Sequence, residues 1–210
     1  MVGQTMTARE QVLARIRKSQ GGPANQTIPR EYAEVSPLSR EEVVEQFADR
    51  LRDYNATVHR CATTAIAETV AGILRARGKT GLLVPAGVPA AWLPAGFTFR
   101  VDEGLSYADL DASPGVLTAC DAAIALTGTI VIAHTPVQGR RALSLVPDYH
   151  LCVVRLEQLV ATVPEGMRRM AGLLPAPLTT ISGPSATSDI EMIRVKGVHG
   201  PRTLEVILVD

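Results

Sequence analysis

The sequence predicts an α/β fold in which helices cover both faces of a central sheet. Helical patterns alternate with short apolar segments along the chain, and most of these segments are continuously apolar, as expected for strands buried on both sides. Gly81 to Val84, for example, is apolar throughout and follows a helical pattern after a tight turn at Gly78. With 210 residues, 46% of them hydrophobic, the chain is long enough to bury such a core.

A separate helix is expected at the N-terminus. Thr7 and Glu10 have the spacing of a capping box, and basic residues gather near the other end of the same segment, where the helix dipole favours them. Residues 20–37 contain three prolines and no hydrophobic period, which indicates a linker. We therefore expect an N-terminal helix and linker over residues 1–37 and an α/β domain over residues 38–210.

Further elements follow from caps and periodicity. Ser39 and Glu42 form a second capping box, and the apolar spacing after it predicts a helix through about Asp53. A third helix is expected to end before Gly78. Strands are expected at 55–61, 81–84, 98–101, 115–119, 122–126, 129–134, 150–154, 178–182 and 204–209. The strands on either side of Gly128 are candidates for an antiparallel pair, and helices are expected over 156–170 and, in short form, after Ser188.

The composition excludes several classes of protein. The 21 Lys and Arg residues balance 21 Asp and Glu residues, so the chain lacks the basic excess that general nucleic-acid binders need. The longest apolar segment is interrupted by Asp121 and by Thr127-Gly128-Thr129, which leaves it too short and too polar to span a bilayer. The N-terminus has no secretory signal pattern. We therefore expect a soluble, cytoplasmic protein that binds neither nucleic acid nor membranes.

The cysteines do not form a metal-binding or disulfide pattern. Cys61, Cys120 and Cys152 are far apart in the sequence, include no CxxC pair and are odd in number. Each stands in an apolar or strand-like segment, which favours a buried, unreactive thiol. We therefore expect neither a metal, nor an iron–sulfur cluster, nor another cofactor in this chain.

The densest group of candidate site residues follows the strand expected at 178–182. Its members are Ser182, Gly183, Ser185, Thr187, Ser188 and Asp189. A hydroxyl-rich loop with a glycine, placed at a helix N-terminus, can bind an anion through free backbone N–H groups and the helix dipole. The alternative is that the last serine and Glu191 form a capping box and the aspartate complements the dipole, with no ligand.

A second candidate is Thr127-Gly128-Thr129, where a glycine interrupts two apolar segments. A glycine at such a position forms a β-bulge, or it leaves room for a ligand or for another stretch of backbone. The sequence pattern does not distinguish between these alternatives.

The third candidate is the turn that runs from Gly197 through His199 and Gly200 to Arg202. The imidazole can act as an acid, a base or a hydrogen-bond donor to an anion, and the guanidinium can bind a carboxylate through two hydrogen bonds. The alternative is a surface turn with a solvated histidine.

Other polar residues give weaker signals. Several polar residues stand at the ends of two expected strands or in the loop between these strands. They would line a pocket only if the strand ends lie close together in the fold. These residues are His134, Arg140, Arg141, Ser144, Asp148 and His150. His59 has the pattern of an ordinary strand residue. HExxH, GxSxG, P-loop and strand-following GxGxxG motifs are absent from the sequence, so it has no signature of the common hydrolases, NTPases or dinucleotide enzymes.

The sequence resembles the lactate-utilisation protein C family (LutC/YkgG), which carries the LUD domain. The resemblance lies in DAAIALTGTIVIAHT with RALSLVPDYHLCVV, and in TTISGPSATSDIEMIRVKGVHGPRTLEVILVD, and it covers residues 115–210 closely. It implies a three-layer α/β/α sandwich like that of the NagB/RpiA/CoA-transferase group. It also implies that the chain works beside iron–sulfur partner proteins that oxidise L-lactate to pyruvate, with the clusters in those partners.

The motifs of that family fall on the candidate residues described above. Its Thr-Gly-Thr element corresponds to residues 127–129, Ser-Gly-Pro-Ser to 182–185, Thr-x-Asp-Ile to 187–190 and Gly-x-His-Gly-Pro to 197–201. Family members usually carry an acidic residue before the first element and often a basic residue after the second. This sequence has Leu126 and Ala186 at those positions.

The resemblance and the candidate residues lead to one expected function and two alternatives. We expect a non-redox accessory subunit of a lactate oxidation system, which binds a small carboxylate or a partner surface through residues 182–189, Gly128 and the His199 turn. The first alternative is a free-standing enzyme, similar to isomerases or transferases, acting on a phosphorylated sugar, a thioester or a folate, with His199 or Asp189 as acid or base. The second is a pure scaffold. The sequence has no independent catalytic signature.

Overall fold

The computed structural model describes residues 7–19, 31–188, 194–197 and 199–210. The chain divides into two compact units, residues 1–32 and 33–210. In the first, α1 (Ala8–Ser19) follows the expected cap, because the Glu10 carboxylate accepts a hydrogen bond from the Thr7 N–H at 2.7 Å. None of the residues of α1 is buried. The autonomy of residues 38–210 as a domain stays a prediction.

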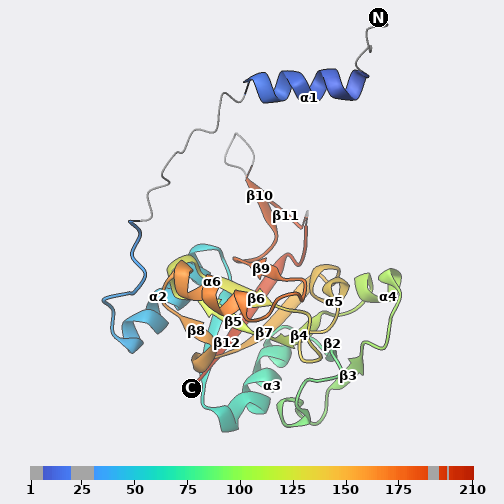
Figure 1. The fold of residues 1–210 in the computed structure, drawn as a ribbon. Coiled ribbons are helices and arrows are strands. Elements are labelled where there is room, and N and C mark those ends of the chain that lie inside the picture. The colour runs from blue at the N-terminus through green and yellow to red at the C-terminus, as the bar shows by residue number, and fades with distance from the viewer. Residues whose placement is uncertain (1–6, 20–30, 189–193, 198) are drawn as a thin grey trace, which may run out of the picture. The chain divides into compact units, whose positions relative to one another are not determined.

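The second unit is built on a parallel sheet of six strands, which lie in the order β1-β12-β7-β4-β2-β3 (Figure 1). The strands are β1 (Thr57–Cys61), β2 (Gly81–Val84), β3 (Thr98–Val101), β4 (Val116–Ala119), β7 (Tyr149–Arg155) and β12 (Thr203–Val209). Every residue of β2 and β4 is buried, which confirms that the continuous apolar segments are two-sided strands.

A second, smaller sheet has the strand order β8-β5-β6-β9. It consists of β5 (Ala122–Ile124), β6 (Thr129–Ile132), β8 (Leu159–Val160) and β9 (Thr179–Ile181). The antiparallel pair expected around Gly128 is confirmed, because β5 and β6 pair antiparallel with Ile124 opposite Thr129. A separate antiparallel pair, β10 (Ala186–Ser188) with β11 (Arg194–Lys196), follows the second sheet in the chain.

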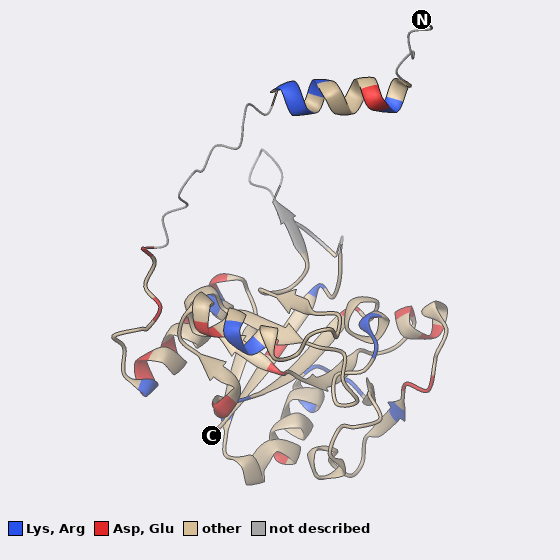
Figure 2. Ribbon diagram, in the orientation of Figure 1, with Lys and Arg blue, Asp and Glu red and all other residues tan. Residues whose placement is uncertain are grey.

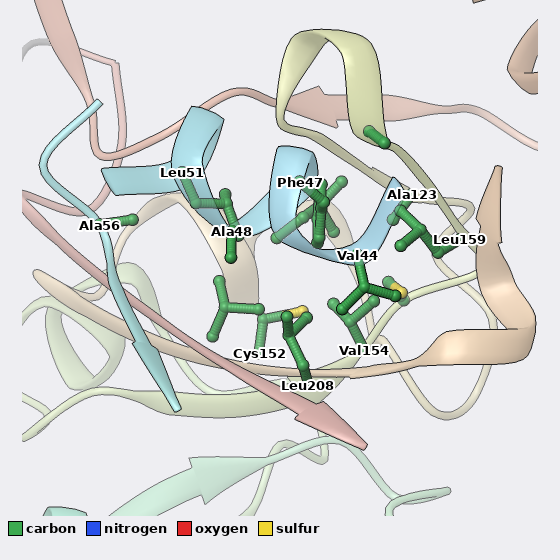
Figure 3. Packing of buried hydrophobic residues seen from close by; sticks show 14 of the residues in the cluster. Val44, Phe47, Ala48, Leu51, Ala56, Ala123, Cys152, Val154, Leu159 and Leu208 are labelled. Atoms are coloured by element: carbon green, nitrogen blue, oxygen red, sulfur yellow. The ribbon is translucent and has the colours of Figure 1, made fainter. Parts of the chain in front are cut away.

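The helix α2 (Arg40–Asp53) covers one face of the large sheet. Its capping box is formed as expected, with the Ser39 side chain accepting from the Glu42 N–H. Figure 3 shows Val44, Phe47, Ala48 and Leu51 of this helix facing strand residues such as Val154 and Leu208. The second sheet contributes Ile130 and Ile132 to the same core, so α2 and this sheet together cover that face.

The opposite face is covered by α3 (Ile66–Ala76), whose apolar side packs on β2, β4, β7 and β12. The remaining helices are α4 (Tyr107–Asp111), α5 (Arg141–Leu145) and α6 (Val163–Ala171), and single 3₁₀ turns stand at residues 63–65, 90–92, 125–127 and 156–158. The expected α/β fold, a mainly parallel sheet flanked by helices, is confirmed. The expectation included the antiparallel pair of the second sheet, but not a separate sheet of four strands.

One of the expected helices needs correction. The pattern over 156–170 is not one helix, because residues 156–158 form a 3₁₀ turn, β8 follows, and α6 begins only after Thr162, which caps it together with Glu165. Residues 159–160 pair with β5 instead of continuing a helix, and the side-chain amide of Gln158 before them donates to the carbonyl of Cys120 at 2.6 Å. The short helix expected after Ser188 falls on residues 189–193, outside the described residues, and the residues on both sides of it are strands.

Acidic and basic residues are interspersed over the second unit in Figure 2 rather than separated on two faces. This distribution agrees with the absence of a basic excess in the sequence. In the described part of the chain, no helix has the length and apolar character needed to cross a membrane.

Candidate functional site

A cleft of about 200 Å³ lies where the second sheet meets the amino ends of the large sheet. It is lined by Ser144 and Leu145 of α5, by residues 179–185, which are β9 and the loop after it, and by residues 199–201, which precede β12. The Ser-Gly-Pro-Ser loop and the His199 turn, which are separate in the sequence, therefore line one cleft.

Ser185 holds these two segments together. Its backbone N–H donates to the carbonyl of Pro201 at 2.8 Å, and its carbonyl accepts from the N–H of Gly197 at 3.0 Å. Its hydroxyl oxygen accepts from the N–H of His199 at 2.9 Å. The proton of that hydroxyl can still be donated, because the oxygen is only an acceptor in the contact with His199.

Gly183 lies close to another part of the protein, the residue that follows α2. Its φ is +90°, and a Cβ at this position would lie 2.4 Å from the Cβ of Tyr54, just after α2. Only glycine combines this backbone conformation with this contact at no steric cost. The loop is thereby fixed against the end of α2.

The Thr-Gly-Thr element reaches the cleft indirectly. The hydroxyls of Thr127 and Thr129 are 2.7 Å apart, and the Thr129 hydroxyl is 2.8 Å from that of Ser182, which lines the cleft. Gly128 itself faces α2, since a Cβ there would lie 2.7 Å from the Cβ of Arg50. Of the alternatives considered for this glycine, the structure supports the one in which it leaves room for another stretch of backbone.

Another expected site residue, Arg202, does not line the cleft. Arg202 is exposed and forms an ion pair with Asp148. Thr187 lies in β10, and Asp189 lies outside the described residues. The helix whose dipole was expected to act on this loop falls on residues 189–193, outside the described residues, and it stays a prediction.

The chemistry of the cleft is that of neutral hydroxyl groups. Its described lining contains no Lys, Arg, Asp or Glu, and His199 is the titratable side chain in it. Serine and threonine hydroxyls donate and accept hydrogen bonds, so such a lining recognises a ligand by hydrogen-bond geometry rather than by countercharge. A volume of about 200 Å³ is below that of pockets for drug-sized ligands, which are roughly 300–1,000 Å³. The cleft suits a small polar molecule.

Sequence reasoning missed two polar residues of this lining, Thr179 and Thr180. They stand at the start of β9, and threonine there is equally typical of an ordinary strand, so no local signal separated them from the sheet. Of the weaker candidates, Ser144 lines the cleft, and His134 contacts the Thr179 hydroxyl through Nε2 at 2.8 Å. His150 lies in β7 and is instead buried, with Nε2 2.7 Å from the Thr118 hydroxyl.

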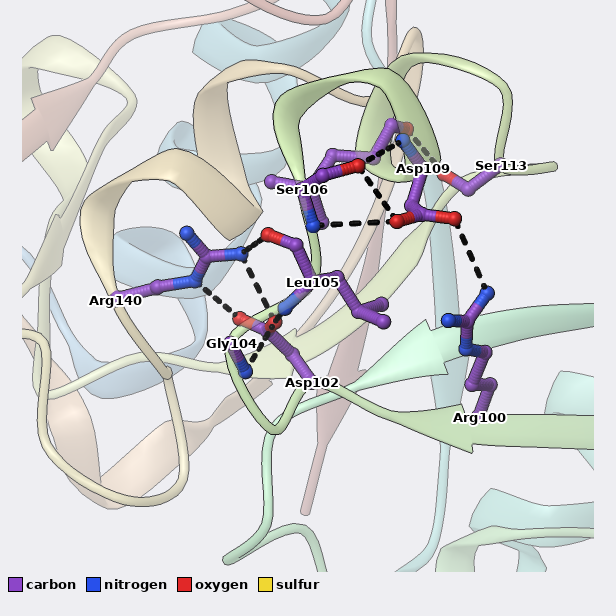
Figure 4. Close-up of polar contacts among 9 residues, drawn as sticks. Arg100, Asp102, Gly104, Leu105, Ser106, Asp109, Ser113 and Arg140 are labelled. Atoms are coloured by element: carbon purple, nitrogen blue, oxygen red, sulfur yellow. Dashed lines mark hydrogen bonds and ion pairs between the residues drawn. The ribbon is translucent and has the colours of Figure 1, made fainter.

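The loop between His134 and α5 is anchored at its far end by Arg140. Figure 4 shows the guanidinium against Asp102, with Nε donating to Oδ2 at 2.7 Å, while Asp102 also accepts from the Leu105 N–H at 3.0 Å. Burial opposes the charged form of Asp102, but the hydrogen bonds from Arg140 and the loop N–H groups hold the pKa of this carboxyl below its usual value. The loop is therefore tied to the carboxyl end of β3.

The described residues contain no group of His, Cys, Asp and Glu side chains that could hold a metal ion. Cys120 and Cys152 are buried and Cys61 is partly exposed, and all three are free thiols.

Comparison with known proteins agrees with the fold. A model of the LUD domain matches residues 100–209. Lactate utilization protein C of Deinococcus radiodurans is 46% identical over 98% of this chain and 97% of its own length, and the protein of the same name from Exiguobacterium sp. is 30% identical over 98% and 97%. YkgG of Escherichia coli, an uncharacterized protein, is 34% identical over 57% of this chain and 51% of its own.

A solved structure gives the same result. The crystal structure of a DUF162 family protein from Deinococcus radiodurans superposes with a TM-score of 0.72 at 43% identity, and the match covers 83% of this chain and 100% of that one. Relatives of this identity and coverage share the family as well as the fold. The chain belongs to the LUD-domain family, as its resemblance to lactate-utilisation protein C indicated.

Proposed function

We propose that this chain is a non-redox accessory subunit of a lactate oxidation system and that it binds a small carboxylate in the cleft between β9 and the His199 turn. The names of its relatives support a role in lactate utilisation. The observation that carries the binding proposal is the convergence of the Ser-Gly-Pro-Ser loop and the His199 turn on one cleft.

The lining suits a short carboxylate. The oxygens of a carboxylate accept hydrogen bonds, and the cleft offers the hydroxyls of Ser182 and Ser185 together with the His199 ring as donors. The absence of Lys and Arg from the described lining disfavours a phosphate ester, whose double charge is normally met by cationic side chains. The cleft volume of about 200 Å³ is ample for a three-carbon acid.

The proposed partners are iron–sulfur proteins that carry out the oxidation. The chain offers no metal-ligand group among the described residues, so we place the electron-transfer step in the partners. We expect this chain to be cytoplasmic with them.

Growth tests the role in lactate utilisation. Deleting the gene should abolish growth on L-lactate but not on pyruvate, and the full-length chain should restore it. A deletion strain that grows normally on L-lactate and assembles normal iron–sulfur partners would refute the accessory role.

Ligand-induced thermal shifts test the cleft. The purified protein should be stabilised by L-lactate or pyruvate, because a ligand that binds only the folded state raises its stability. Ser182→Ala should reduce the shift, whereas the matched removal of a hydroxyl at the exposed strand residue Thr57, Thr57→Val, should not. A large shift with a sugar phosphate, a thioester or a folate, and none with short carboxylates, would favour the alternative of a free-standing enzyme.

A further inference from the structure

The cleft is connected to His134 through one of its lining residues. The hydroxyl oxygen of Thr179 lies 2.8 Å from Nε2 of His134. On the other side of the ring, Nδ1 lies 3.1 Å from the carbonyl oxygen of Gly139. A chain of two hydrogen bonds therefore runs from a backbone carbonyl through the imidazole to the hydroxyl of a residue that lines the cleft.

The direction of both hydrogen bonds follows from their end groups. A carbonyl oxygen only accepts, so Nδ1 must carry the proton that is donated to Gly139. In the neutral ring Nε2 then has only its lone pair, and the Thr179 hydroxyl must donate to it. A hydroxyl has one proton, so the oxygen of Thr179 has only lone pairs left for a ligand.

The imidazole is held in this orientation by its own backbone. His134 has φ +53°, a conformation that non-glycine residues rarely adopt. The turn after it is closed by the N–H groups of Gln138 and Gly139, which both donate to the carbonyl of Thr135, and it is anchored beyond by Arg140. Rotation of the ring would break both of its hydrogen bonds.

We propose that His134 makes Thr179 a hydrogen-bond acceptor in the cleft and thereby selects 2-hydroxy acids over 2-oxo acids. The inference rests on the proposed function, in which the cleft binds a short carboxylate. The C2 hydroxyl of a 2-hydroxy acid can donate to Thr179. The C2 carbonyl of a 2-oxo acid can only accept, so its oxygen would face the lone pairs of Thr179 without a proton between them. A site that requires a donor discriminates strongly against a ligand that lacks it.

Calorimetric titration of the full-length protein with L-lactate and with pyruvate tests the selection. At about pH 8, L-lactate should bind at least about tenfold more tightly than pyruvate. Thr179→Val should abolish this preference, Thr179→Ser should keep it, and Thr57→Val should leave both affinities unchanged. His134→Asn, which tolerates the positive φ, should free the Thr179 hydroxyl to donate and bring the two affinities together.

The outcomes separate the two proposals. Equal affinities for lactate and pyruvate in the wild type, or a lactate preference that survives Thr179→Val and His134→Asn, would overturn the role of His134 and Thr179 and leave the carboxylate cleft standing. Absence of binding for either acid would overturn the carboxylate cleft, and the inference with it. Circular dichroism melts of each variant identify a failure to fold, and retention of the preference in Thr179→Ser shows that the hydroxyl itself is responsible.

Discussion

Nε2 of His59 lies 2.6 Å from Oε2 of Glu205, a carboxylate whose side chain is only 2% exposed. The other carboxylate oxygen accepts from Nε of Arg77 at 2.5 Å and from the hydroxyl of Tyr149 at 3.2 Å. Four segments, β1, β7, β12 and the end of α3, therefore meet at one buried charge. His59, which has the sequence pattern of an ordinary strand residue, is one of the groups that allow this charge to be buried.

Removing the charge of Glu205 should destabilise the fold. Glu205→Gln keeps the size of the side chain but leaves Arg77 without its counterion and His59 without its carboxylate partner, and we expect a loss of about 2 kcal/mol in the free energy of unfolding. The value is moderate because the Arg77 and His59 side chains are 42% and 31% exposed and can be hydrated. Urea denaturation measures it. Glu41→Gln, which removes an exposed partner of Arg60, is the matched control and should change stability by less than about 0.5 kcal/mol.

His150 should make the protein less stable in mild acid. Complete burial lowers the pKa of His150 to about 4, whereas in the unfolded chain it is about 6.5. Between these values the unfolded state binds a proton that the folded state does not, so stability falls as the pH falls from 6.5 toward 4 and this contribution is flat above 6.5. The full effect is roughly 3 kcal/mol.

Urea denaturation between pH 7 and about pH 4.5 checks this dependence, with His150→Leu as the comparison. The variant should lose stability at neutral pH, because the hydrogen bond between the ring and the Thr118 hydroxyl is lost, but its difference from the wild type should shrink as the pH falls. A difference that is constant with pH would show that His150 does not titrate in this range.

Gly183→Ala should disrupt the loop that lines the cleft. The added Cβ would lie 2.4 Å from the Cβ of Tyr54 at a φ of +90°. Gly104 has nearly the same φ, +91°, but a Cβ added there would have no neighbour within 4 Å, so Gly104→Ala isolates the cost of the backbone conformation. We expect a loss of about 3 kcal/mol for Gly183→Ala and about 1 kcal/mol for Gly104→Ala by thermal or urea unfolding. Equal losses would mean that the contact with Tyr54 relaxes freely.

The three thiols should differ in reactivity. Cys61 is partly exposed, whereas Cys120 and Cys152 are buried, and the contact of Cys120 with Cys152 together with burial raises the pKa of the Cys120 thiol. Because thiolates are the reactive form, a thiol reagent should modify Cys61 first in the native protein. Mass spectrometry of the labelled peptides checks the order. Rapid labelling of Cys120 or Cys152 without denaturant would contradict the buried positions of these thiols.

The large elements were predictable because their signals are local. The capping box of Ser39 with Glu42 and the four-residue apolar spacing after it depend only on neighbours along the chain, and both appear in α2 as expected. The buried strands β2 and β4 were equally clear from their continuous apolar sequence. The pattern over 156–170 was misleading because residues 159–160 pair with β5, a distant segment of the chain, instead of continuing a helix.

The candidate site was predicted in part for the same reason. Gly183, Ser185 and His199 stand in turns whose composition marks them, and the structure brings all three to one cleft. Thr179 and His134 gave no comparable signal, since a threonine in a strand and a histidine after one are ordinary, and their contact joins residues that are 45 positions apart.

The sequence by itself determined the α/β class, the principal helices and strands, the LUD-domain family and the lack of a basic excess, because these depend on composition, local periodicity and motifs. Only the tertiary structure decided that Gly128 faces Arg50, that Glu205 is buried among His59, Arg77 and Tyr149, and that two loops form one neutral cleft. The physical reason is that such contacts are fixed by the packing of α2 and the two sheets. This packing brings together residues that are far apart in the sequence.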